Sequence, residues 1–223
     1  MGRRKFKYED YNKSEPYADA TKYFIVYEGK VKEPNYFEAF NEKFIDKSKA
    51  FICHILEEDT GVIGNTPLKL KERAEKFISN PPSNIKVTPY KDDKIRFVID
   101  VDKHGEDKLN ELIDYSERLE DAMVFISNYC FEVWLWSHIE DLSKITSISS
   151  KEIKRELPTI HNLNFPHDFL TVDRIKNAVK RNKELDNTKN VIPDKVLSKV
   201  YLLIEELLEH SFFEISVDTE EIN

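Results

Sequence analysis

The sequence contains no apolar run of the roughly 18 residues that a membrane-spanning helix needs. Residues 1–20 also lack the apolar segment of a signal peptide, so we expect a cytoplasmic protein with no membrane partner. The only two cysteines, Cys53 and Cys130, lie in apolar stretches and predict buried thiols in a reducing compartment. Neither CxxC nor HxxxH occurs, which argues against a zinc site.

Positive charge is also scarce, because 34 Lys and Arg residues face 42 Asp and Glu residues and leave a net charge of −8. This balance argues against a protein that coats nucleic acid indiscriminately. Basic residues still gather at 3–7, 69–76 and 174–183. The last stretch is either a solvated helix face or a surface that follows a nucleic-acid backbone. Its candidate binding residues are Arg174, Lys176, Lys180, Arg181 and Lys183.

Glycine is rare as well, with five in the chain, and two of them fall in the loop 60–66. This loop has neither the GK[ST] ending nor the GxGxxG pattern of a nucleotide-binding loop, so we do not assign it that role. Another glycine, Gly29, directly follows the first apolar segment. It allows the tight turn and the positive φ that a strand-to-helix corner often needs.

Short apolar segments rich in β-branched and aromatic residues alternate with amphipathic helical patterns along the first part of the chain. Strands are predicted at 22–27, 49–56, 94–101 and 122–127, and helices at 33–45, 68–78, 105–119 and 130–139. This alternation predicts an α/β fold with a mostly parallel sheet between helices. After it come predicted helices at 151–156, 172–185 and 194–210 and a weak strand at 212–217.

The predicted organisation is an irregular arm over residues 1–20, an α/β core over 21–140 and a C-terminal helical extension over 141–223 that packs on the core.

The stretch KIRFVIDVDKH, residues 94–104, predicts a buried strand with two carboxylates at its exit. Asp100 and Asp102 lie two residues apart, so in extended backbone both point to the same side. They stand at the carboxyl end of the strand, where open α/β sheets bind their ligands. Neighbouring carboxylates repel each other unless a cation or a proton separates them, and Mg²⁺ (or Mn²⁺) suits oxygen ligands. The alternative is a strand that simply ends in solvated acids.

Further acids follow other predicted strands. Glu28 ends the first strand, and the exits of parallel strands share one sheet edge, so Glu28 can meet Asp100 and Asp102. Glu132 lies in the otherwise apolar stretch CFEVWLWSHI, so it either pairs with a cation or faces the site. Glu33, Glu57 and Glu132 are available for a second metal, whereas we expect His138 to be a core histidine.

The stretches YFIVYEGKVKEPNYFEAF, FVIDVDKHG and ISNYCFEVWLWSH resemble the Toprim domain and, within that class, the RloB family, over roughly residues 20–210. The chain departs from the family pattern at Tyr129, where Pro is usual, and at Lys32, where Thr is frequent. The resemblance implies a Mg²⁺-dependent nuclease of phage defence or abortive infection. It assigns Glu28 as metal ligand or general base, Asp100 and Asp102 as Mg²⁺ ligands, and Glu132 as a fourth acid.

The same resemblance implies a nucleic-acid substrate, DNA or RNA with tRNA among the candidates, together with an ATPase subunit of the RloA or AbiL type. The alternative is a non-catalytic or effector-gated Toprim-like binding subunit of a defence complex. Intact acids favour the nuclease, whereas the net acidity of the chain favours the second interpretation or a nuclease that needs a basic partner.

Overall fold

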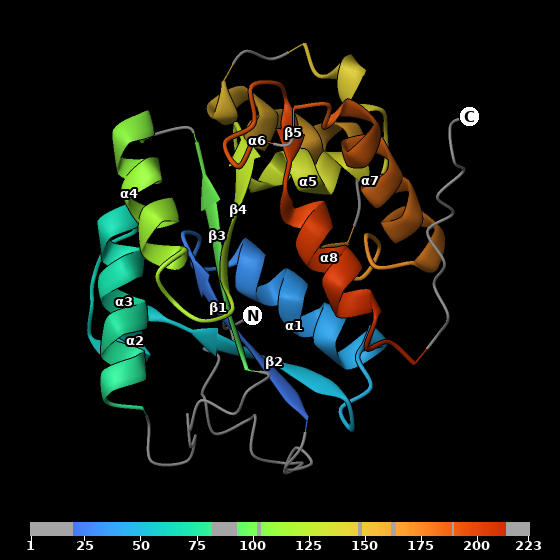
Figure 1. Ribbon diagram of the computed structural model, residues 1–223. Coiled ribbons are helices and arrows are strands. Elements are labelled where there is room, and N and C mark those ends of the chain that lie inside the picture. The colour runs from blue at the N-terminus through green and yellow to red at the C-terminus, as the bar shows by residue number, and fades with distance from the viewer. Residues whose placement is uncertain are drawn as a thin grey trace, which may run out of the picture.

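Five strands form one sheet in the order β2-β1-β3-β4-β5 (Figure 1). This computed structural model describes residues 20–81, 93–101, 104–146, 149–161 (side chains only to 157), 164–188 and 190–212. The first four strands are parallel and the fifth pairs antiparallel with β4. The strands are β1 Thr21–Tyr27, β2 Ala50–Ile55, β3 Lys94–Asp100, β4 Ala122–Asn128 and β5 Leu197–Ser198.

Helices cover both faces of the sheet, because β1 and β3 are apolar on both sides (Figure 1). Alternate residues of β1 enter different cores: Tyr23 packs with one set of helices and Phe24 with the other. The helices of the first core are α1 Lys32–Phe44, α5 Phe131–Ser137, α6 Ser150–His161, α7 Val172–Leu185 and α8 Val200–Leu208. The second core contains α3 Pro67–Ser79 and α4 Glu106–Ser116. Two short helices, α2 Glu57–Thr60 and η2 Leu142–Lys144, complete the described elements.

The α/β fold with a mostly parallel sheet is confirmed, but the end of the chain differs from the prediction. The helix expected over 194–210 begins only at Val200, because Leu197 and Ser198 first pair with β4. Ser127 Oγ and Ser198 Oγ also lie 2.8 Å apart in this pairing. The arm at 1–20 and the weak strand at 212–217 lie almost wholly outside the described residues.

A buried ion cluster ties α8 to the sheet. Arg96, on β3, is only 1% exposed and donates through Nε and Nη2 to the two Glu206 carboxylate oxygens at 2.9 and 2.6 Å. Lys94 Nζ lies 2.7 Å from the same carboxylate. Burial alone would raise the pKa of Glu206, but Arg96 and Lys94 outweigh it and lower that pKa.

In the described part of the chain, every helix is too short or too polar to cross a membrane.

Candidate metal centre

Glu28 and Asp100 meet where two neighbouring parallel strands end. Glu28 N donates to Val98 O at 3.0 Å and so extends the β1–β3 ladder by one residue. The chain then turns away from the sheet, and the Glu28 carboxylate takes over: Asp100 N donates to Glu28 Oε2 at 2.9 Å. Both residues are buried, with exposed fractions of 8% and 6%. The predicted meeting of these acids at the sheet edge therefore has a local cause: the Glu28 carboxylate accepts the hydrogen bond from the Asp100 amide that a backbone carbonyl of a longer β1 would otherwise accept.

Glu33 brings a third carboxyl into this edge from the first turn of α1. A Cβ on Gly29 would lie 1.8 Å from Glu33 Oε2, so only glycine leaves room for the carboxyl to fold back over the β1–α1 turn. The positive φ that a glycine allows is not adopted at Gly29, because the glycines with positive φ among the described residues are Gly61 and Gly64. The glycine is needed for a close approach and not for a left-handed backbone.

Glu132, near the start of α5, is both paired with cations and directed toward the site. Lys32 Nζ lies 2.5 Å from Glu132 Oε1. Lys154 Nζ, from α6, lies 4.0 Å from Glu132 Oε2 and 3.7 Å from Asp100 Oδ2. The Lys154 ammonium thus bridges the acids of β3 and α5, and it brings the C-terminal part of the chain to the site.

His104 lies against the same acids from the segment before α4. Its Nε2 is 3.3 Å from Glu28 Oε2, and its side chain is 6% exposed. The peptide bond between Asn128 and Tyr129, at the exit of β4, is cis.

The four carboxyls Glu28, Glu33, Asp100 and Glu132, called the acid cluster below, are crowded and mostly desolvated. The pKa of Glu33 is raised to about 7, chiefly by burial and then by the charges of Glu132 and Glu28, against the lowering effects of a backbone hydrogen bond and of Lys154. Burial, and then Glu33 and Glu28, raise the pKa of Asp100 well above its ordinary value. Ionising the whole acid cluster is therefore unfavourable without an additional positive charge.

The chemistry of the donors fits a hard divalent cation, which prefers carboxylate oxygens. Lys154 already shows that a cation is accommodated between Asp100 and Glu132. Among the described residues no three acids, histidines or cysteines converge into a ready-made metal cage. Asp102, the second acid of the DxD pattern, lies outside the described residues.

The RloB-like protein family matches residues 23–207, which run from β1 into α8 and include the whole acid cluster. The chain belongs to the RloB-like protein family. No curated protein and no solved structure matches it. The family resemblance drawn from the strand-exit motifs is thereby confirmed.

In this RloB-like chain, most cations predicted to bind nucleic acid on α7 already have partners within the chain. Arg174 donates to Asp168 O, and Arg181 Nη1 donates to Ser137 O at 2.6 Å. Lys183 pairs with Glu205 at 2.9 Å, and the exposed Lys180 pairs with Glu184 at 3.8 Å. Lys176, the fifth predicted residue, is half-buried on the same helix. The role of these residues in nucleic-acid binding stays a prediction.

Two other side chains singled out from the sequence, Glu57 and His138, have their interaction partners outside the acid cluster. Glu57, expected to be available for a second metal, pairs with Lys30 at 2.6 Å. His138 accepts or donates a hydrogen bond with Tyr36 Oη at 3.0 Å, and burial lowers its pKa to about 3. His138 therefore stays neutral in the core, as an internal packing residue would.

Sequence reasoning did not find Lys154. A lysine in a helix as polar as α6 carries no local sign of its target. The buried Asp100 and Glu132 that it contacts come from distant segments. The one available signal was indirect, since a buried glutamate at 132 required some cation.

Proposed function

We propose that this member of the RloB-like family is a metal-dependent nuclease of phage defence or abortive infection. The observation that carries the proposal is the acid cluster. Buried carboxyls gather at the exits of adjacent parallel strands, and burial together with the neighbouring acids raises the pKa of Glu33 and of Asp100. Perturbed acids of this kind concentrate at functional sites. This location is also where open α/β sheets bind their ligands.

In this proposal Glu28, Asp100 and Asp102 hold Mg²⁺ or Mn²⁺, with Glu132 as a fourth acid. The bound ion would neutralise charge on the transferring phosphate and lower the pKa of the attacking water. Glu28 is fixed by the Asp100 amide, so its carboxylate is held rigidly at the strand exit. Lys32 holds Glu132 in place through one carboxylate oxygen. Lys154, which faces Asp100, is placed to approach a phosphate oxygen of the substrate.

The proposed substrate is nucleic acid, DNA or RNA, with tRNA among the candidates. The net charge of −8 and the internal pairing of the α7 cations support a second component that supplies basic surface. An ATPase subunit of the RloA or AbiL type is the proposed partner. Association with such a subunit would bring the polyanion toward an otherwise acidic molecule.

One observation favours the alternative of an effector-gated, non-catalytic subunit. Lys154 already bridges Asp100 and Glu132, so part of the charge in the acid cluster is balanced by the protein's own side chain. A site neutralised in this way could serve to stabilise a fold that binds an effector. The two proposals differ in one outcome: the nuclease cleaves nucleic acid and needs the acids to do so, whereas the non-catalytic subunit does not cleave.

The test is cleavage of plasmid, single-stranded DNA and total tRNA by the purified chain with Mg²⁺ or Mn²⁺. Glu28→Gln and Asp100→Asn should abolish cleavage while far-ultraviolet circular dichroism stays native. Glu42→Gln, an exposed acid on α1, is the matched control and should cleave like wild type. Metal-dependent cleavage that survives both acid variants would contradict the proposal. If cleavage appears only when the ATPase subunit is added, the partner is required.

A further inference from the structure

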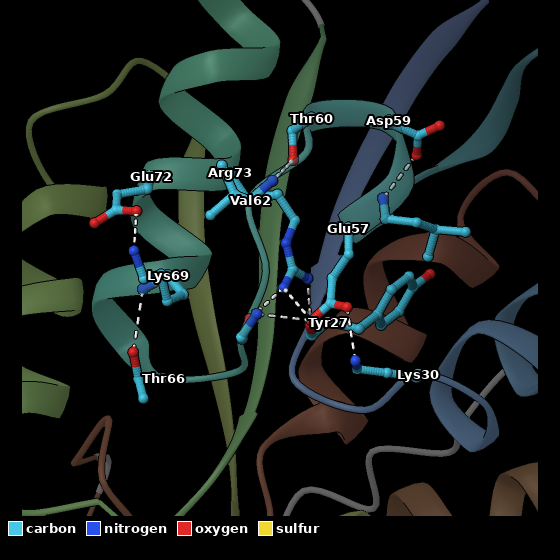
Figure 2. Close-up of polar contacts among 12 residues, drawn as sticks. Tyr27, Lys30, Glu57, Asp59, Thr60, Val62, Thr66, Lys69, Glu72 and Arg73 are labelled. Atoms are coloured by element: carbon cyan, nitrogen blue, oxygen red, sulfur yellow. Dashed lines mark hydrogen bonds and ion pairs between the residues drawn. The ribbon is translucent and has the colours of Figure 1, made fainter.

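A second charged group lies beside the acid cluster, on the side of β2. Its centre is the Glu57 carboxylate, at the start of α2. Lys30 Nζ lies 2.6 Å from Glu57 Oε2, and the Gly64 amide donates to Glu57 Oε1 at 2.9 Å. Arg73 Nη2 lies 3.6 Å from the same Oε1. Three donors from three different segments therefore converge on one anion, as Figure 2 shows for Lys30 and Arg73.

Arg73 is the fixed part of this group. It is 2% exposed, and it donates to Tyr27 O at 3.0 Å (Figure 2). It also donates to Gly64 O at 2.6 Å. Tyr27 is the last residue of β1 and precedes Glu28 of the acid cluster. Arg73 Nε is buried with no hydrogen-bond partner among the described residues. The guanidinium is thus a rigid positive charge with a spare donor, next to the strand that carries the acid cluster.

Lys30 is the accessible part. Its side chain is 57% exposed, whereas that of Glu57 is only 15% exposed. Burial alone would raise the pKa of Glu57, but Lys30, the Gly64 amide and Arg73 outweigh it and lower that pKa. This environment stabilises an anion, and it opens to solvent at Lys30. The basic stretch 69–76, for which the sequence offered no role, lies on α3 beside the same loop.

We propose that Lys30, Arg73 and the Gly64 amide form a phosphate-binding subsite that the Glu57 carboxylate occupies until a nucleic-acid phosphate displaces it. The donors present the features that recognise phosphate, namely a guanidinium, an ammonium and a backbone N–H. Lys30 follows Glu28 by two positions, so the subsite and the acid cluster share the segment that follows β1. The identity of the ligand as nucleic acid rests on the proposed function.

Displacement of Glu57 requires little rearrangement, because α2 is a single turn of four residues. It ends at Gly61, whose φ of 65° places it in the left-handed region that glycine adopts readily. Arg73 stays in place during this exchange, since its other two contacts are to backbone carbonyls.

The first test measures binding of a fluorescein-labelled single-stranded oligonucleotide by anisotropy, in EDTA so that neither metal nor cleavage contributes. Glu57→Gln removes the competing charge and should tighten binding roughly fivefold to tenfold. Lys30→Gln should weaken binding by a similar factor and reduce the salt slope by about 0.7, as expected for the loss of one phosphate contact. Glu42→Gln and Lys43→Gln, exposed on α1, carry the same charge changes and should leave affinity near that of wild type.

The second test uses inorganic phosphate alone, by thermal melting at constant ionic strength. Phosphate should raise the melting temperature of Glu57→Gln more than that of wild type, and that of Lys30→Gln least. If neither variant departs from its control in either assay, the subsite does not exist. Phosphate effects in the predicted order, without cleavage even when the ATPase subunit is added, would support the subsite and count against the nuclease, so the two failures are distinguishable.

Discussion

Replacement of Glu33 by Gln should stabilise the metal-free protein at alkaline pH, although it replaces a buried carboxyl of the native sequence with an amide. Glutamine keeps the shape that Gly29 accommodates and removes the charge that burial and the neighbouring acids oppose. The effect is a direct measure of the electrostatic strain in the acid cluster.

The magnitude follows from the pKa of Glu33, which is about 7 in the folded protein against an ordinary value of 4.5. One pKa unit corresponds to about 1.4 kcal/mol, so ionised Glu33 costs the folded state at most roughly 3 kcal/mol. Because the folded pKa lies above the unfolded one, the cost is absent at acid pH, grows as pH rises through this interval and is complete above it. The variant should therefore gain about 2–3 kcal/mol near pH 8 and about 1 kcal/mol or less near pH 5.

The assay is urea unfolding in EDTA at both pH values, with Glu42→Gln as the control on the same helix. The control should not change the free energy of unfolding by more than about 0.5 kcal/mol, as is usual for surface substitutions. A Glu33→Gln protein that is less stable than wild type near pH 8 would refute the reasoning, as would an effect of the same size at both pH values. Either result would mean that the surroundings of Glu33 do not make its ionisation unfavourable in the folded protein.

Three further variants test other parts of the account. Glu206→Gln should cost about 3–5 kcal/mol in chemical unfolding because it leaves the buried Arg96 without its counter-charge, whereas Glu184→Gln in an exposed pair should cost at most about 1 kcal/mol. The folded pKa of His138 is about 3, below that of the unfolded chain, so the free energy of unfolding of the wild type falls as pH falls below about 6.5. His138→Gln should reduce the slope of this dependence by about 1 kcal/mol per pH unit. Gly29→Ala should expel the carboxyl that folds over it and weaken Mg²⁺ binding in calorimetry, with the circular dichroism spectrum unchanged. A pH dependence in His138→Gln as steep as that of wild type, wild-type metal affinity in Gly29→Ala, or equal costs at the two glutamates would each contradict the corresponding argument.

The sheet and its acid edge were predictable because they depend on local patterns. Apolar strands between amphipathic helices predict parallel pairing, and parallel pairing brings Glu28 and Asp100 to one edge. The confirmed family membership covers this region as well. The sequence could not show which hydrogen bonds hold each carboxylate in place, such as the one that the Asp100 amide donates to Glu28.

The rest depended on tertiary structure. The strand Leu197–Ser198 is too short to show any periodicity, so its residues were assigned to the following helix. The fold of Glu33 over Gly29 requires the conformation of the turn between them. Glu57 looked like one more acid at a strand end, and only its contacts with Lys30 and Gly64 separate it from the acid cluster.

The central claim is that the acid cluster is a divalent-metal site, and calorimetric titration with Mn²⁺ tests it most directly. The account predicts that wild type and Glu42→Gln bind Mn²⁺ and release protons on binding, because metal replaces protons on raised-pKa carboxyls. Asp100→Asn should lose this binding while it remains folded. Binding of equal strength in Asp100→Asn, or no binding by folded wild type, would contradict the claim.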